Sequence, residues 1–367
     1  MTGRASALAS AAREHGVDVV LVSDLVDVRW LTGFTGSSAL AALSVEGPGP
    51  GTLLTDFRYV EQVAEQVDPA WKVAQITRDL PGPAVEEQFD AIWSHDRTAR
   101  IGFDDRAVSV HALDGLRDAL GDRAELIAAG GLVAPLREIK DAGEAGRVRA
   151  AAQLADQALL QVLERGLAGR TETALALDLE ITMRGLGAQE LSFAPIVAAG
   201  AHGALPHAEP REVVIERGQL VTIDWGCRLD GYCSDCTRTF AAGPGVEDAA
   251  REVYELVLQA QEAALAAVVP GAAGRDVDAV ARAIIDEAGH GERFGHGLGH
   301  GVGLEVHEGP RLSRRSESTL AAGMVVTVEP GIYVPGRFGV RIEDLVLVTA
   351  DGHEVLNGLT KDLQEIG

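Results

Sequence analysis

Residues 221–239, VTIDWGCRLDGYCSDCTRT, set two aspartates into strand-like apolar sequence. The tripeptide LDG at the centre is a turn signal, so the flanking runs are predicted to pair as a β-hairpin. If Leu229 and Asp230 form the turn, Asp224 lies opposite Asp235, with Cβ atoms about 5 Å apart. Two carboxylates in that position destabilise a hairpin unless a positive charge lies between them. The alternative is a register slipped by one residue, which points one aspartate to solvent.

A second strand-like stretch, residues 324–348, repeats this arrangement of acids. Glu329 and Glu343 lie at mirrored positions around Gly336, and apolar residues flank both of them. Both side chains are therefore expected to approach a core, where an ionised carboxylate is costly unless it is paired or coordinates a metal. Together the two hairpins supply four carboxylates. With an imidazole, these suit a pair of divalent cations such as Mn²⁺, Co²⁺ or Zn²⁺.

Imidazoles are concentrated in residues 295–308, GHGLGHGVGLEVHE, which contain His296, His300 and His307. These histidines could be metal ligands, acid/base groups or polar residues of a loop. Glycine at every second position from 295 to 303 argues against a helix, so the first two histidines do not form a helical zinc motif. The glycines also lack the GxGxxG spacing of a dinucleotide loop, and no GxSxG motif marks a serine nucleophile.

Composition excludes several partners and locations. The net charge of -23 would repel nucleic acid and anionic membrane surfaces, so neither is an expected partner. The sequence contains neither an apolar signal segment nor a membrane-spanning run of about 18 residues. Three cysteines, Cys227, Cys233 and Cys236, are too few for a disulfide scaffold and fit a cytoplasmic protein. The last two flank Asp235, and they are packing residues unless one of them points toward a metal.

The order of predicted elements indicates an α/β (α+β) protein with two domains. Short strand-like runs alternate with amphipathic helices over residues 1–131, and a Gly/Pro-containing stretch follows. Residues 132–367 form the second domain, in which two pairs of helices accompany the two acid-bearing strand pairs. These helices are predicted at residues 141–164, 171–183, 246–267 and 275–288.

Seven motifs follow one another along almost the whole chain. They are VRWLTGFTGS (28–37), LREIKDAGE (136–144), FAPIVAAGAHGALPHAEP (193–210), DWGCRLDGYCSDCTRTF (224–240), GHGLGHGVGLEVHEGPRL (295–312), VVTVEPGIY (325–333) and GVRIED (339–344). In these motifs the chain resembles the proline-specific metallopeptidases of the methionine aminopeptidase/prolidase superfamily. The resemblance implies a creatinase/prolidase-like domain at 1–131 and a "pita-bread" catalytic domain at 132–367.

The resemblance also implies a role for each site residue. Five residues would bind two divalent ions, with Mn²⁺ expected ahead of Co²⁺ or Zn²⁺: Asp224, Asp235, His300, Glu329 and Glu343. Asp235 and Glu343 would bridge the ions, and Glu329 would also act as the base. Three histidines and two arginines would act on the substrate: His207 and His307 beside the scissile bond, His296 in the substrate pocket, Arg341 near the metals, and Arg311 on the carboxylate of a dipeptide.

The implied activity is hydrolysis of the Xaa-Pro bond, preferably in dipeptides, by a homodimeric prolidase. Aminopeptidase P, which removes the residue before proline from longer peptides, is the first alternative. A non-catalytic pita-bread module that binds peptide or protein is the second, but such relatives generally lack the ligands that are present here. A creatinase-like amidinohydrolase shares the fold without needing the five metal ligands.

Overall fold

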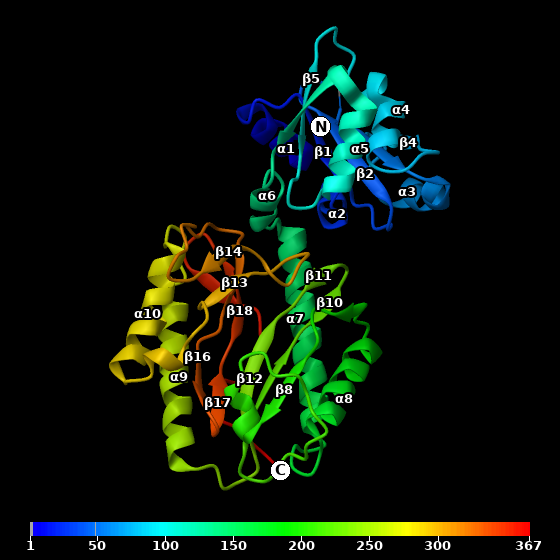
Figure 1. Ribbon diagram of the computed structural model, residues 1–367. Helices are drawn as coiled ribbons and strands as arrows, with labels where there is room; N and C mark the ends of the chain where they lie inside the picture. Colours follow the sequence, from blue (N-terminus) through cyan, green and yellow to red (C-terminus); the bar gives the residue numbers. More distant parts are fainter. Residues whose placement is uncertain (1–2, 48) are drawn as a thin grey trace. The chain divides into compact units, whose positions relative to one another are not determined.

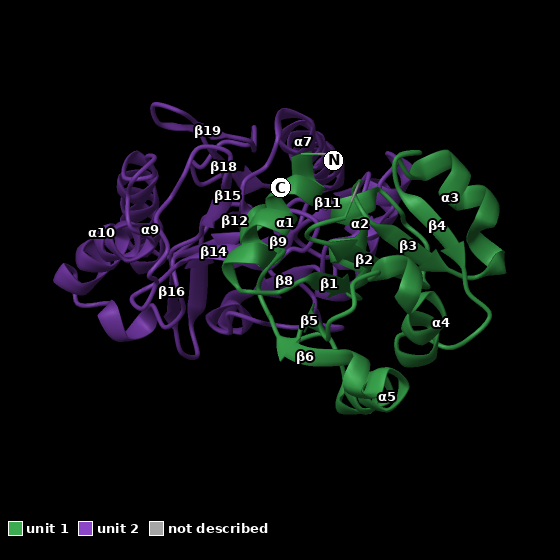
Figure 2. Ribbon diagram, turned by 90° about the horizontal axis from the view of Figure 1, so that it is seen from above, with its two compact units in different colours: residues 1–137 green, residues 138–367 purple. Residues whose placement is uncertain are grey.

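A computed structural model describes residues 3–47 and 49–367 and divides the chain into two compact units. Unit 1 is Met1–Arg137 and unit 2 is Glu138–Gly367, coloured separately in Figure 2. The predicted domain boundary between 131 and 132 lies shortly before this division, ahead of helix α6 (Ala134–Glu138). Within the described ranges, no helix combines the length and the apolar character that crossing a bilayer requires.

Unit 1 is built on a six-stranded mixed sheet with the order β4-β3-β2-β1-β5-β6. Its apolar strands form a core with helices α4 and α5, which explains the alternating strand and helix patterns in the sequence. The strands are β1 (Val19–Val22), β2 (Ala39–Ser44), β3 (Thr52–Thr55), β4 (Lys72–Gln75), β5 (Ala99–Phe103) and β6 (Ala124–Ala128). The helices are α1 (Gly3–Glu14), α2 (Leu25–Thr32), α3 (Val60–Gln66), α4 (Gly82–Ile92) and α5 (Val110–Leu120).

Unit 2 has two halves, each made of a curved sheet covered by a pair of helices (Figure 1). In the first half, α7 (Ala142–Leu163) and α8 (Glu172–Gly185) pack on a sheet with the order β20-β12-β9-β8. In the second half, α9 (Asp248–Ala266) and α10 (Gly274–Glu287) pack against a sheet with the order β14-β13-β15-β18-β19. The four predicted helices of this domain are thus confirmed.

The strands of unit 2 are short and come mostly as hairpins. Those of the first half and its side sheet are β7 (Glu190–Leu191), β8 (Ile196–Ala199), β9 (Leu220–Trp225), β10 (Cys227–Leu229), β11 (Tyr232–Cys233), β12 (Cys236–Ala242) and β20 (Glu365–Ile366). Those of the second half are β13 (Gly299–Gly301), β14 (Glu308–Leu312), β15 (Val325–Val328), β16 (Gly331–Val334), β17 (Phe338–Arg341), β18 (Asp344–Val348) and β19 (His353–Val355).

The first acid-bearing hairpin has a different register from the predicted one. Asp224 faces Thr237, not Asp235, so the predicted pairing is wrong by two residues. The turn residues are Asp230 and Gly231, with φ of 48° and 81°. Asp-Gly adopts this left-handed conformation more readily than a pair that includes leucine. Because strand side chains alternate between faces, a shift of two leaves both aspartates on the same face of the hairpin.

The second acid-bearing hairpin has the predicted symmetry. Val328 pairs with Asp344 on one side of the acids, and Gly331 pairs with Arg341 on the other. This register places Glu329 opposite Glu343, and the turn lies at Gly336, whose φ is 71°. The mirrored positions recognised in the sequence are therefore confirmed.

Candidate metal centre

Asp235, His300 and Glu343 form the centre of the candidate site. One ligand-type atom from each lies within 4.8 Å of the others, and all three residues are buried. His300 Nε2 is 3.6 Å from Asp235 Oδ2 and 3.4 Å from Glu329 Oε1. Asp235 comes from the first half of unit 2, and the other residues come from the second half. The site therefore combines residues from both halves of unit 2.

The glycines around His300 are explained by close packing of strand β13. A Cβ atom on Gly299 would collide with the carbonyl oxygen of Thr327, and one on Gly301 would collide with that of Gly309. Residues 299–301 form a strand, which agrees with the exclusion of a helix but was not itself predicted, and the neighbouring backbones approach too closely for side chains. His300 is thus held between two strands, and its ring is the side chain that projects from β13 toward the carboxylates.

The orientation of the His300 ring suits metal coordination. Its Nδ1 lies 3.1 Å from the carbonyl oxygen of Gly301, which can only accept, so Nδ1 carries the proton. Nε2, which faces the carboxylates, then presents a lone pair, as a metal-binding imidazole must. Burial lowers the pKa of His300 to about 3, so the ring is neutral.

Glu343 and Asp224 are held by neighbours that leave one oxygen of each available. Thr237 Oγ1 donates to Glu343 Oε2 at 2.7 Å, and Arg341 Nη2 donates to Asp224 Oδ2 at 2.6 Å. The other oxygens, Asp224 Oδ1 and Glu343 Oε1, are buried and receive no hydrogen bond from any residue that the structure describes. An unsatisfied buried carboxylate oxygen is costly, and a divalent cation is a partner that would satisfy it.

Glu329 completes the group of acids from the turn between β15 and β16. Thr327 Oγ1 donates to Glu329 Oε1 at 3.2 Å and accepts from the backbone N–H of His300 at 3.1 Å. This threonine therefore ties the acid and the imidazole to one strand. Burial raises the pKa of Glu329 to about 7, and the same cause raises the pKa of Asp235 and Glu343. Mutual repulsion of the carboxylates adds to that effect, and bound cations would remove it.

All of the predicted site residues line one cavity of about 550 Å³ in unit 2. They are His207, Asp224, Asp235, His296, His300, His307, Arg311, Glu329, Arg341 and Glu343. The residues predicted as ligands are buried or half-buried, whereas His207, His307 and Arg311 are exposed. The His307 ring lies 4.4 Å from that of His300, and Arg311 is paired with His300 in the β13–β14 ladder. The structure thus brings the set together, and the role of each member stays a prediction.

Tyr333 and Thr237 belong to the site although sequence reasoning gave neither a role. Tyr333 OH lies 2.9 Å from His296 Nε2 and accepts from Arg341 Nη1 at 2.9 Å. Thr237 Oγ1 accepts from Arg341 Nε at 3.0 Å in addition to bonding Glu343. Thr237 could have been found from the alternation of side chains along a strand. It is two residues from Asp235 and therefore lies on the same face.

The three cysteines are packing residues in unit 2. Cys227, Cys233 and Cys236 are at most 1% exposed, and each thiol lies near a backbone carbonyl. Sγ of Cys233 is directed at the carbonyl of Leu304, and Sγ of Cys236 at that of Glu343. The described residues that approach one another closely enough to hold an ion are Asp235, His300 and Glu343, without a thiol. The three thiols therefore have the orientation that was expected if the cysteines are packing residues.

Two family models match this chain. Residues 146–350 match metallopeptidase family M24, and residues 4–139 match the creatinase/prolidase N-terminal domain. Metallopeptidases of this kind require divalent metal ions, and the carboxylate and histidine cluster fits that requirement. The predicted fold class, with a creatinase/prolidase-like domain followed by a pita-bread catalytic domain, is thereby confirmed.

Similar proteins are known over the full length of the chain. It is 35% identical to Xaa-Pro dipeptidase of Pyrococcus furiosus, over 99% of this chain and 100% of that protein. A solved Xaa-Pro dipeptidase from Bacillus anthracis is 39% identical, with a TM-score of 0.93 over 98% of both chains. A solved X-Pro aminopeptidase from Thermotoga maritima is 35% identical, with a TM-score of 0.88 over 97% of this chain and 100% of that one.

Proposed function

The chain belongs to metallopeptidase family M24, and we propose that it hydrolyses the peptide bond before proline, with Xaa-Pro dipeptides as preferred substrates. The main observation that supports this proposal is that four acids and one imidazole converge in one cavity. The same cavity also contains an exposed arginine and two exposed histidines. Relatives named as Xaa-Pro dipeptidases support the substrate class.

The proposed cofactor is a pair of divalent cations, Mn²⁺ ahead of Co²⁺ or Zn²⁺. Their ligands would be Asp224, Asp235, His300, Glu329 and Glu343, with Asp235 and Glu343 shared between the ions. Oxygen donors with one imidazole suit these metals, and the two unsatisfied carboxylate oxygens support the assignment. When bound, two such ions supply Lewis acidity, which makes water a nucleophile near neutral pH.

The chain's own residues would handle the protons. Glu329 is the proposed base, because it combines a position beside His300 with a hydrogen bond from Thr327 that fixes its carboxylate. His207 and His307 are proposed to stabilise the developing oxyanion or to protonate the leaving nitrogen. Their exposure in the cavity supports this role, since groups that act on a substrate must remain accessible to it.

Substrate recognition is assigned to the basic and aromatic side of the cavity. Arg311 is proposed to bind the free carboxylate of a dipeptide through charge-assisted hydrogen bonds. His296, held by Tyr333, would line the pocket for the proline ring. Arg341 would act indirectly, because its guanidinium bonds Asp224, Thr237 and Tyr333 and so fixes the wall of the cavity.

Aminopeptidase P activity on longer peptides is the second candidate. It is favoured by the similarity to an X-Pro aminopeptidase, which is nearly as close as the similarity to the dipeptidases.

Two further proposals concern the location of the protein and its oligomeric state. The three free thiols suit a reducing cytoplasm, and the family resemblance suggests a homodimer, which light scattering would test.

The decisive experiment compares hydrolysis of Ala-Pro and Ala-Pro-Ala by the full chain. Each substrate is tested with Mn²⁺ and after treatment with a chelator. We expect Ala-Pro to be cleaved faster, and both activities to disappear on chelation and return with Mn²⁺. Cleavage of the tripeptide alone would favour the aminopeptidase, and cleavage of neither with any of the three metals would refute the proposal.

A further inference from the structure

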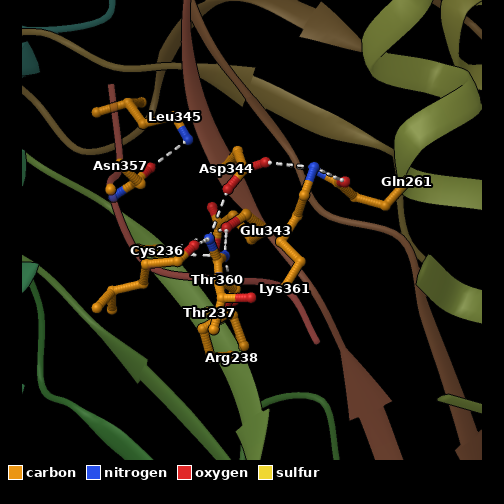
Figure 3. Close-up of polar contacts among 12 residues, drawn as sticks. Cys236, Thr237, Arg238, Gln261, Glu343, Asp344, Leu345, Asn357, Thr360 and Lys361 are labelled. Carbon is orange, nitrogen blue, oxygen red and sulfur yellow. Dashed lines mark hydrogen bonds and ion pairs between the residues drawn. The ribbon is translucent and has the colours of Figure 1, made fainter. Parts of the chain in front are cut away.

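Figure 3 shows a buried polar cluster around Arg238 of β12. Strand side chains alternate, so Thr237 reaches the carboxylates while the next residue, Arg238, points the other way. The Arg238 side chain is 2% exposed, and its ion-pair partner Asp344 is 1% exposed. Neither of them lines the cavity. Asp344 directly follows Glu343, so the cluster contacts the same turn that carries a proposed ligand.

The guanidinium of Arg238 joins that turn to the C-terminal segment of the chain. Nη1 donates to the carbonyl oxygen of Glu343, and Nη2 donates to Asp344 Oδ1 at 2.7 Å. The same group donates to the carbonyls of Leu359 and Thr360, at 2.9 and 3.1 Å. One side chain therefore bonds two adjacent residues of the ligand turn and two adjacent residues of the C-terminal segment.

Further contacts fix both partners of Arg238. Asp344 Oδ2 accepts from Gln261 Nε2 at 2.9 Å and lies 3.2 Å from Lys361 Nζ (Figure 3). Tyr254 OH donates to the carbonyl of Lys361 at 2.7 Å, which anchors the segment to helix α9. These bonds leave the segment little freedom beside β12.

The segment is also attached to the other half of unit 2. Asp156, on helix α7, accepts from the backbone N–H of Gly358 at 2.6 Å and from Asn357 Nδ2 at 3.3 Å. Asn357 Oδ1 in turn accepts from the N–H of Leu345 at 2.7 Å. Residues 357–361 are thus bonded to both halves and to the strand that follows Glu343.

Glu343 itself is bonded to β12 at four points, one of which is the hydrogen bond from Cys236 Sγ to its carbonyl at 3.3 Å. Its N–H donates to the carbonyl of Thr237 at 3.0 Å, its carboxylate accepts from Thr237 Oγ1, and its carbonyl accepts from Arg238. We propose that Arg238 is a positioning residue, which connects residues 357–361 to the metal centre through the main chain of Glu343. It holds the main chain of Glu343 in the orientation that presents Oε1. This inference rests on the metal ligands proposed above.

The test is a measurement of Mn²⁺ binding by calorimetry on chelator-treated full-length protein. In Arg238→Lys the charge is kept, but a single ammonium cannot reach all of the separate acceptors that the planar guanidinium reaches, which also include the carbonyl of Thr237 and Sγ of Cys236. Outer partners of metal ligands typically contribute 10–100-fold in affinity, so we expect a loss of roughly that size. Cobalt-loaded protein should also show a changed visible spectrum, since the geometry around the shared ligand changes.

The matched control is Arg251→Lys. Arg251 Nη2 bonds Glu365 Oε1 at 2.6 Å, so it also holds the C-terminal segment, but the pair is exposed and remote from Glu343 in the bonding network. Its affinity for Mn²⁺ should equal that of the wild type. If Arg238→Lys does not fold, Lys361→Met replaces it, because Lys361 is 22% exposed and its loss removes one bond to Asp344. We expect a loss of about tenfold there.

The outcomes separate this inference from the proposed function. Wild-type protein that binds no Mn²⁺, Co²⁺ or Zn²⁺ would refute the metal centre and the inference with it. Wild-type protein that binds Mn²⁺ while the Arg238 variant, or its Lys361 replacement, binds equally tightly would overturn the inference alone. A lower melting temperature with unchanged affinity would show that Arg238 only stabilises the fold.

Discussion

Replacing Asp235 with asparagine should stabilise the metal-free protein and destabilise the metal-loaded one. Asp235 is buried beside Glu343, Asp224 and Glu329, and Arg341 is the cation that offsets this repulsion. Ligand-type oxygens of Asp235 and Glu343 lie within 4.8 Å of each other. At an effective dielectric constant of 20, repulsion at that distance is about 3.5 kcal/mol. Since Arg341 cancels part of it, we expect a gain of roughly 2 kcal/mol in unfolding free energy.

The assay is urea unfolding in the presence of a chelator, read by hydrogen exchange in peptides from unit 2. With Mn²⁺ at about 100 times its dissociation constant, the wild type should gain about 2.7 kcal/mol. The variant lacks a shared ligand and should gain far less, so the order of stabilities reverses.

Asp278→Asn is the control, because Asp278 is an equally buried aspartate with favourable partners. Its carboxylate accepts from Arg282 at 2.7 and 2.8 Å and from the N–H of Leu298 at 3.0 Å. Removing its charge should lower stability by roughly 3 kcal/mol, with or without metal. If Asp235→Asn also lowers stability in the chelator, the carboxylates do not repel one another as the geometry indicates, and the reasoning is wrong.

Three further outcomes are expected. Glu329→Gln should fold normally but cleave Ala-Pro at least about 100-fold more slowly, and full activity would contradict its assignment as base. Arg311→Met should raise KM for Ala-Pro by about tenfold or more and change KM for the amide Ala-Pro-NH₂ little, because the amide lacks the carboxylate; equal effects on both would exclude the proposed contact. Burial raises the pKa of Cys227 to about 11, so a thiol reagent at pH 8 should label none of the three cysteines until the protein is unfolded. Rapid labelling of the native protein would contradict their role in packing.

Much of the site could be predicted because its acids come from local hairpins. The mirrored positions of Glu329 and Glu343 follow from a single turn, and the observed register agrees. The pairing of Asp224 was wrong because the turn uses Asp230 and Gly231, where positive φ is least costly. The prediction that Asp224 and Asp235 lie on one face of the hairpin was nevertheless right, since a shift of two residues does not change the face on which a side chain lies.

Other features depend on packing between distant segments. The glycines beside His300 were recognised as incompatible with a helix, but their cause is contact with the backbones of Thr327 and Gly309. Tyr333 and Thr237 lie within two of the seven motifs, but the resemblance gave neither of them a role. Their roles come from the guanidinium of Arg341, which reaches both of them across the site.

The residues alone therefore determined the two acid-bearing hairpins, the turn of the second one and the face that their acids share, because hairpin pairing and alternation act over a few residues. Only the tertiary structure decided which oxygens are left unsatisfied at the centre and which side chains remain exposed to a substrate. It also decided that Arg238 joins the C-terminal segment to the turn of Glu343. Arg238 and Glu343 are 105 residues apart in the sequence, and the packing of the two halves brings them together. No local pattern encodes such a contact.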